Sequence, residues 1–194
     1  MSKTSWVFNS GDSADQLVKN ICQETGVKTF DLAVILGSGW GNAAQFGEPL
    51  VSVEYRDWSC FPAGQITGHS GTLSAVKYAS WNLLFFSGRF HCYQGLSAFD
   101  ASFPVRLASA LGCPRILLTC ATGGINRQMN PGDFMLVDDH INLLGDNPLR
   151  GLSGDIFVDM AGAYQDDVYA ELLANDLNEL TVHRGVLAAM HGPS

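Results

Sequence analysis

The chain has 194 residues, of which 46% are apolar and 15% are charged, and it contains 21 glycines. This length suits one domain or two small ones with a buried core, and the apolar share excludes a disordered tail protein. The formal net charge of −8 disfavours binding to a nucleic-acid backbone or an anionic membrane, but it permits a small anion held by a few local donors.

Cysteine usage and the N-terminal segment indicate the compartment. The five cysteines are scattered without a CxxC pair, which fits neither a disulfide framework nor a zinc site. Residues 1–25 lack a basic segment followed by an apolar one, and no run reaches the ~18 apolar residues of a membrane span. The sequence predicts a reduced, soluble, cytoplasmic protein, and residues 1–194 are predicted to form a single domain because no linker or repeat interrupts them.

Helix and strand patterns alternate along the chain. Ser13-Ala-Asp-Gln16 has the pattern of a capping box and opens a helix that ends at Gly26. Short apolar runs that break into glycine or polar residues are typical of buried strands, and they occur at 32–36, 82–86, 116–120 and 134–137. One helix is predicted from Ser97 to Gly112 and another over about 164–180. Strands interleaved with helices predict an α/β fold.

Each of the four predicted strands ends in a segment rich in glycine or polar residues. Ligands of α/β sheets bind at the carboxyl edge, so we expect these segments to converge on one crevice. Gly37-Ser-Gly-Trp-Gly41, after the first strand, offers backbone N–H groups and the Ser38 hydroxyl to an anion. A plain tight turn is the alternative, and the spacing departs from the dinucleotide fingerprint.

The segment Gly88-Arg-Phe-His-Cys-Tyr93 follows the second predicted strand. The guanidinium of Arg89 is a planar fork that matches phosphate oxygens. His91 and Tyr93 lie on the same side as Arg89 if the chain remains extended. The alternative is an arginine paired to a surface carboxylate beside a histidine satisfied in the core. We interpret the combination as functional.

Four further loops have two interpretations each. The loop Gly68-His-Ser-Gly71 offers an imidazole and a hydroxyl, but an ordinary loop is the simpler interpretation, and it lacks the G-x-S-x-G pattern of serine hydrolases. The segment 121–126 supplies backbone donors or forms a turn, whereas 138–142 and 147–151 are polar site segments or interface loops. The spacing of the histidines predicts no zinc site.

Together these segments resemble the trimeric purine nucleoside phosphorylases. The motifs GSGWG, GHSG, GRFHCYQG, FPVR, ATGGIN, GDFMLVDDHIN and NPLRG occur in the family's order and approximate spacing, from about residue 31 to 194. The resemblance implies a three-layer α/β/α fold with a central mixed sheet. It also implies phosphorolysis of purine (2′-deoxy)ribonucleosides to the free base and pentose 1-phosphate by a homotrimer, with inorganic phosphate as co-substrate and neither a metal nor an organic cofactor.

The resemblance also assigns residues to roles. The positions that match the family's phosphate site are Ser38, His69, Arg89, His91 and the backbone N–H of Ala121. Arg89 and His91 are the predicted catalytic residues, and Tyr93 matches an aromatic that contacts the sugar. One arginine with hydroxyl, imidazole and amide groups orients phosphate for attack on the anomeric carbon without neutralising it.

Three features depart from the family pattern. The chain stops at Ser194, where the family continues with segments that recognise the purine, so the resemblance predicts a C-terminally truncated chain whose base-binding residues have no counterpart here. The stretch 150–160 is shorter than in the family, which has a phenylalanine there that reaches a neighbouring subunit, and Phe157 is the candidate substitute. Thr67 and Cys120 replace a proline and an asparagine that are common in the family.

Two other functions stay open at this point. The first is a truncated, non-catalytic relative that binds phosphate or nucleoside or assembles with full-length subunits. The second is a dinucleotide-dependent oxidoreductase, which is supported only by the glycine loop after Leu36. The related activity on 5′-methylthioadenosine is disfavoured, because DHINLLGDNPLRG resembles the purine nucleoside type.

Overall fold

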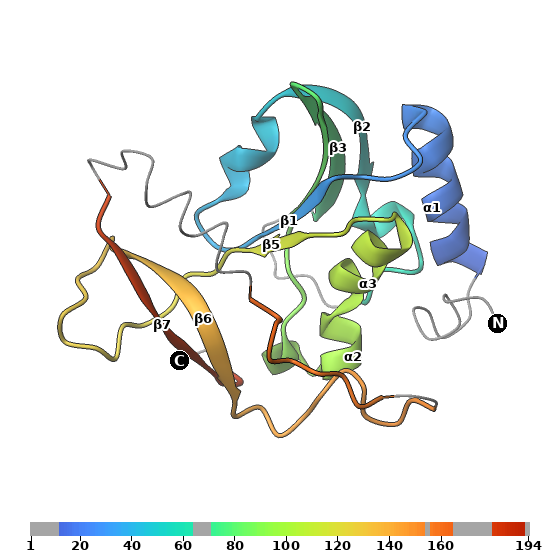
Figure 1. The fold of residues 1–194 in the computed structure, drawn as a ribbon. Helices are drawn as coiled ribbons and strands as arrows, with labels where there is room; N and C mark the ends of the chain where they lie inside the picture. Colours follow the sequence, from blue (N-terminus) through green and yellow to red (C-terminus); the bar gives the residue numbers. More distant parts are fainter. Residues whose placement is uncertain (1–11, 64–70, 154–155, 165–179, 193–194) are drawn as a thin grey trace. The chain divides into compact units, whose positions relative to one another are not determined.

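The computed structural model describes residues 12–63, 71–153, 156–164 and 180–192. The chain divides into two compact units, Met1–Ala121 and Thr122–Ser194 (Figure 1). Within the described ranges, none of the helices has the length and apolar character needed to cross a bilayer.

The first unit is built on one mixed sheet. Its strands are β1 (Leu32–Leu36), β2 (Glu48–Glu54), β3 (Thr72–Tyr78), β4 (Trp81–Ser87) and β5 (Ile116–Leu118), in the order β2-β3-β4-β1-β5. β1 runs parallel to β4 and β5, whereas β3 is antiparallel to β2 and β4. The helices are α1 (Asp12–Thr25), α2 (Ala98–Ala101) and α3 (Phe103–Ala110), with 3₁₀ turns η1 (Gly41–Gln45), η2 (Tyr55–Asp57) and η3 (Cys92–Gln94). The predicted α/β class and mixed sheet are confirmed.

Successive side chains of a strand point to opposite sides, so a continuous apolar strand such as β1 makes both faces of this sheet apolar. Along β1, Ala33 and Ile35 join one buried cluster, whereas Val34 and Leu36 join the other. α1 and α3 pack on the first face, where Figure 1 shows them on one side of the sheet. Ala43 and Ala44 of η1 pack on the second face. Burial from both sides fixes the central strands and therefore the positions of their carboxyl ends.

The helix predicted from Ser97 to Gly112 is wrong in its continuity, because it consists of two short helices. Its start is confirmed: the Ser97 hydroxyl accepts a hydrogen bond from the Asp100 N–H at 3.1 Å as the N-cap of α2. α2 ends at Ala101 with Ser102 as its C-cap, and Pro104 lies in the first turn of α3. A proline is tolerated there because the N–H groups of a first turn have no partner within the helix.

The described part of the second unit is a parallel pair of strands, β6 (Phe134–Asn142) and β7 (Val182–Ala189). The strand predicted at 134–137 thus extends to Asn142. An ion pair joins Arg184 Nη2 to Asp138 Oδ1 across the two strands at 2.7 Å. The helix predicted over about 164–180 falls on residues 165–179, which lie outside the described ranges.

The pair of Asp133 and His183 is expected to make the stability of this unit depend on pH. The Asp133 carboxylate accepts a hydrogen bond from the Asn130 N–H at 2.9 Å, and the same oxygen lies 2.8 Å from Nε2 of His183. The backbone bond first, and then the bond to His183, hold the pKa of Asp133 below its usual range. A carboxylate with a lowered folded-state pKa stabilises the fold above its unfolded pKa of about 4, and this stabilisation is lost as the pH falls through the folded value.

Asp133→Asn is therefore expected to weaken the hydrogen-exchange protection of the β6 and β7 amides at pH 7. The difference from the wild type should shrink as the pH falls below about 4, because the wild-type carboxyl is then protonated too. Tryptophan fluorescence would not report on this unit, since all four tryptophans precede residue 122. Amide exchange is therefore the suitable measurement. Asp159→Asn is the control, because among the described residues that carboxylate accepts one N–H, that of Ala161 in the same turn. A pH-independent difference would contradict the lowered pKa.

Candidate functional site

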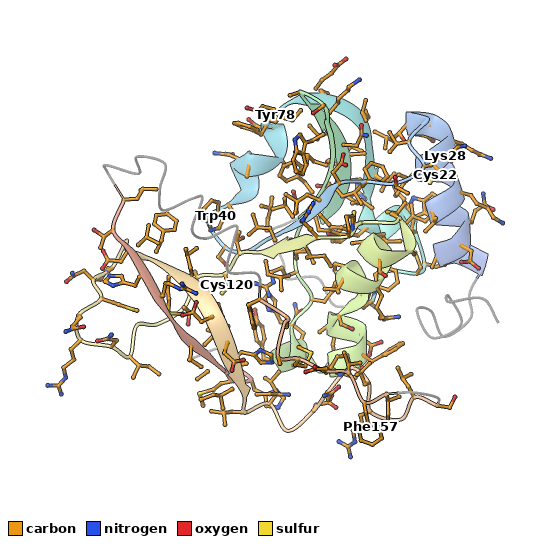
Figure 2. All side chains as sticks on the ribbon, viewed as in Figure 1. Cys22, Lys28, Trp40, Tyr78, Cys120 and Phe157 are labelled. Carbon is orange, nitrogen blue, oxygen red and sulfur yellow. The ribbon has the colours of Figure 1, made fainter. Side chains whose placement is uncertain are left out.

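The carboxyl ends of three parallel strands, β4, β1 and β5, meet at one edge of the first sheet. The register pairs Leu36 with Ser87 and Ile35 with Leu118, so the chain leaves these strands at neighbouring points. Figure 2 labels Trp40 and Cys120, which belong to the segments after β1 and β5. The predicted convergence is confirmed for three of the four strands, whereas β6 belongs to the separate sheet of the second unit.

Gly37 and Thr119 join the ends of β1 and β5. The Gly37 N–H donates to Oγ1 of Thr119 at 2.8 Å, and the Thr119 N–H donates to the carbonyl of Ile35 at 3.1 Å. A Cβ atom on Gly37 would overlap the carbonyl oxygen of Thr119 and lie 2.8 Å from Cα of Cys120. The first glycine of GSGWG is thus required by the close approach of two backbones, and it is followed by the exposed Ser38.

Arg89 reaches from the end of β4 to the end of β5. Its Nη1 donates to the carbonyl of Thr119 at 2.9 Å. Among the described residues, no carboxylate forms an ion pair with Arg89. These residues therefore do not show the alternative, in which the arginine pairs with a surface carboxylate. A half-buried guanidinium with five N–H donors is instead fixed at the edge by one carbonyl.

His91 and Tyr93 form a stacked pair next to Arg89. Their ring centroids lie 4.8 Å apart with 12° between the ring planes. The backbone of His91 is extended, and the η3 turn then brings Tyr93 onto the imidazole. The two rings do lie together, but the extended chain on which the prediction depended is replaced by a turn at η3. Burial, and then the charge of Arg89, lower the pKa of His91, which favours the neutral imidazole at pH 7.

Tyr55 supports the Arg89 segment from the core, and sequence reasoning missed it. Its hydroxyl donates to the carbonyl of Gly88 at 3.2 Å, and its ring stacks on Phe61 with centroids 4.1 Å apart. Burial raises the pKa of Tyr55 far above its usual value. A Cβ atom on Gly71 would overlap this ring. Gly71 is the signal in the sequence that this space is occupied, but a glycine does not identify the ring that occupies it.

The remaining predicted residues have different placements. Ala121 is exposed just beyond β5, and Tyr93 is 42% exposed at the same edge. His69 lies outside the described residues. Phe157, in the second unit, is 92% exposed (Figure 2). In the part of the chain that the structure describes, no three His, Cys, Asp or Glu side chains are placed to hold a metal ion.

Known proteins are similar to this chain in sequence and fold. The family model described as the Phosphorylase superfamily matches residues 31–194. Purine nucleoside phosphorylase 1 of Bacillus subtilis (strain 168) is 40% identical over 169 residues, which cover 84% of this chain and 62% of that protein. The purine nucleoside phosphorylase of Mycobacterium leprae is 34% identical over 188 residues, covering 96% of this chain and 68% of that protein.

A solved structure extends the comparison to the fold. The crystal structure of Schistosoma mansoni purine nucleoside phosphorylase in complex with inosine matches with a TM-score of 0.82 at 28% identity. The match covers 94% of this chain and 67% of that one. This chain spans less than two thirds of the length of the Bacillus subtilis relative.

Proposed function

This chain belongs to the phosphorylase superfamily and, within it, to the purine nucleoside phosphorylases, and we propose that it contributes the phosphate-binding side of such an active site. In the proposed reaction an oxygen of inorganic phosphate bonds to the anomeric carbon of a purine (2′-deoxy)ribonucleoside. The glycosidic bond breaks, its electron pair leaves with the purine, and the purine takes up a proton. The observation that supports this most directly is Arg89, held at the strand edge by a carbonyl rather than a carboxylate.

The proposed roles follow from charge and geometry. Arg89 supplies one positive charge and a planar set of donors for the phosphate oxygens. His91 adds a hydrogen bond without a second charge, because its lowered pKa keeps the ring neutral. The Ser38 hydroxyl and the Ala121 N–H complete the proposed set, and His69 joins it by resemblance to the family. Phosphate is then oriented while it keeps its nucleophilic charge.

The sugar is proposed to lie against Tyr93, whose ring is held by the stack on His91. The reaction draws on no metal or organic cofactor, because phosphate is itself the nucleophile.

A homotrimer in the cytoplasm is part of the same proposal, and the low charged fraction of 15% supports burial of surface between subunits. Sedimentation that finds only a species of 20.9 kDa would contradict the trimer. The oxidoreductase alternative rested on the glycine loop after Leu36, and packing against Thr119 accounts for the first of these glycines, Gly37.

Inosine tests the proposal directly. The chain is incubated with inosine in the presence and absence of phosphate, and the release of hypoxanthine and ribose 1-phosphate is followed by chromatography. We expect release that requires phosphate and yields the two products in equal amounts. Phosphate binding without release of the base would instead assign this chain a phosphate-binding role without catalysis. Absence of both binding and release would contradict the proposal.

A further inference from the structure

We infer that Thr119 is a positioning residue of this site, which holds Arg89 and the segment after β1 in the arrangement that binds phosphate. The inference rests on the proposed function, because it concerns the same site. Thr119 contacts the segments after both other strands of the edge. Its hydroxyl accepts the N–H of Gly37 at 2.8 Å, and its carbonyl accepts Nη1 of Arg89 at 2.9 Å.

The hydroxyl adds to a short attachment, because β5 pairs with β1 over three residues only. This strand has only three residues, and Leu117 and Leu118 are 49% and 57% exposed. Thr119 lies directly beyond the last residue that pairs with β1. Its N–H donates to the carbonyl of Ile35 at 3.1 Å, and its hydroxyl donates to the same carbonyl at 3.4 Å. The side chain thus continues the attachment to β1 beyond the strand.

Two consequences follow for the anion site. Loss of the hydroxyl leaves the part-buried Gly37 N–H without its acceptor, and an unsatisfied donor of this kind destabilises the local arrangement. The carbonyl that anchors Arg89 belongs to the same residue, so a shift of Thr119 moves the guanidinium as well. Thr119 therefore acts on phosphate through Arg89 and through the segment that presents Ser38.

The test compares hydroxyl-free and hydroxyl-bearing variants. Thr119→Val removes the hydroxyl at nearly constant shape, Thr119→Ala is a second hydroxyl-free variant in case valine prevents folding, and Thr119→Ser restores the hydroxyl. Thr25→Val is the matched control, because the Thr25 hydroxyl also donates to a carbonyl, that of Ile21 at 2.7 Å, and accepts an N–H, that of Val27 at 3.1 Å. That pair lies at the end of α1, away from the strand edge.

The dissociation constant for inorganic phosphate is measured by calorimetry, with thermal unfolding and the amide spectrum recorded in parallel. We expect Thr119→Val to raise the constant about tenfold, as the loss of one buried hydrogen bond at the site would, and Thr119→Ser to stay within about twofold of the wild type. The Gly37 amide should lose exchange protection only in the hydroxyl-free variants. Thr25→Val should unfold more easily while it binds phosphate like the wild type.

The outcomes separate the two proposals. Unchanged phosphate binding by Thr119→Val, or equal weakening by Thr25→Val, overturns the positioning role and leaves the proposed function standing. Weak binding by Thr119→Ser also overturns the role, because the hydroxyl is then not what matters. A wild-type chain that binds no phosphate overturns the proposed function and the role of Thr119 with it.

Discussion

Arg89→Met should bind inorganic phosphate about a hundredfold more weakly than the wild type, as expected when one partner of a charge-assisted hydrogen-bonded pair is removed. Arg89 is the residue at the strand edge that supplies a positive charge, since the lowered pKa leaves His91 neutral. The calorimetric dissociation constant for phosphate measures the effect. Arg89→Lys retains the charge but not the planar fork, so we expect an intermediate loss of about tenfold.

Arg56→Met is the control, because Arg56 is an exposed arginine whose partner is the adjacent Asp57. A global effect of lower positive charge would weaken phosphate binding equally in both variants. The site predicts that only the Arg89 variants are affected. Equal dissociation constants for Arg56→Met and Arg89→Met would contradict the assignment of the site.

The same substitution should change the titration of His91. The charge of Arg89 is the second cause of the lowered pKa, after burial of the ring. Arg89→Met removes that cause and leaves the burial, so the pKa of His91 should rise without a full return to the value of an exposed histidine. The ring signals of His91 across pH 5–8 would follow this shift. An unchanged titration would mean that the guanidinium lies farther from the imidazole in solution than it does in the structure.

The strand ends of the site could be predicted because they combine two local signals. β1, β4 and β5 are short apolar runs, and each breaks into glycine or polar residues, so periodicity and turn chemistry agree. β2 and β3 were missed because their patterns are weaker. β2 is an edge strand that contains Pro49 beside an irregularity in its register, and a proline inside a run argues against a strand.

The residues that support the site could not be found from local patterns. Tyr55 and Thr119 act on Arg89 from 34 and 30 positions away in the sequence, through contacts that only the strand register creates. β5 ends at Leu118 rather than at Cys120, and beyond it the Gly37 N–H donates to the Thr119 hydroxyl, whereas the Thr119 carbonyl accepts from Arg89. A threonine at the end of an apolar run has no signal that distinguishes this role from an ordinary strand position.

Gly37→Ala should destabilise the first unit by about 3 kcal/mol, the combined cost of overpacking and a lost hydrogen bond. The added Cβ meets backbone atoms of Thr119 and Cys120, which cannot rotate away as a side chain can. The end of β5 must therefore move from β1, and this breaks the bond from the Gly37 N–H and displaces the carbonyl that holds Arg89. Urea unfolding followed by tryptophan fluorescence measures the change, since the tryptophans all precede residue 122.

Gly41→Ala is the matched control in the same GSGWG segment, because a Cβ on Gly41 has no atom within 4 Å. A segment that needs its glycines for flexibility around an anion would weaken phosphate binding in both variants without much loss of stability. Close packing of two strand ends predicts a different pattern, in which Gly37→Ala loses both stability and phosphate binding and Gly41→Ala retains both. Equal urea midpoints for the two variants would mean that β1 and β5 separate at little cost. That result would contradict the rigid attachment of Arg89 to the strand edge.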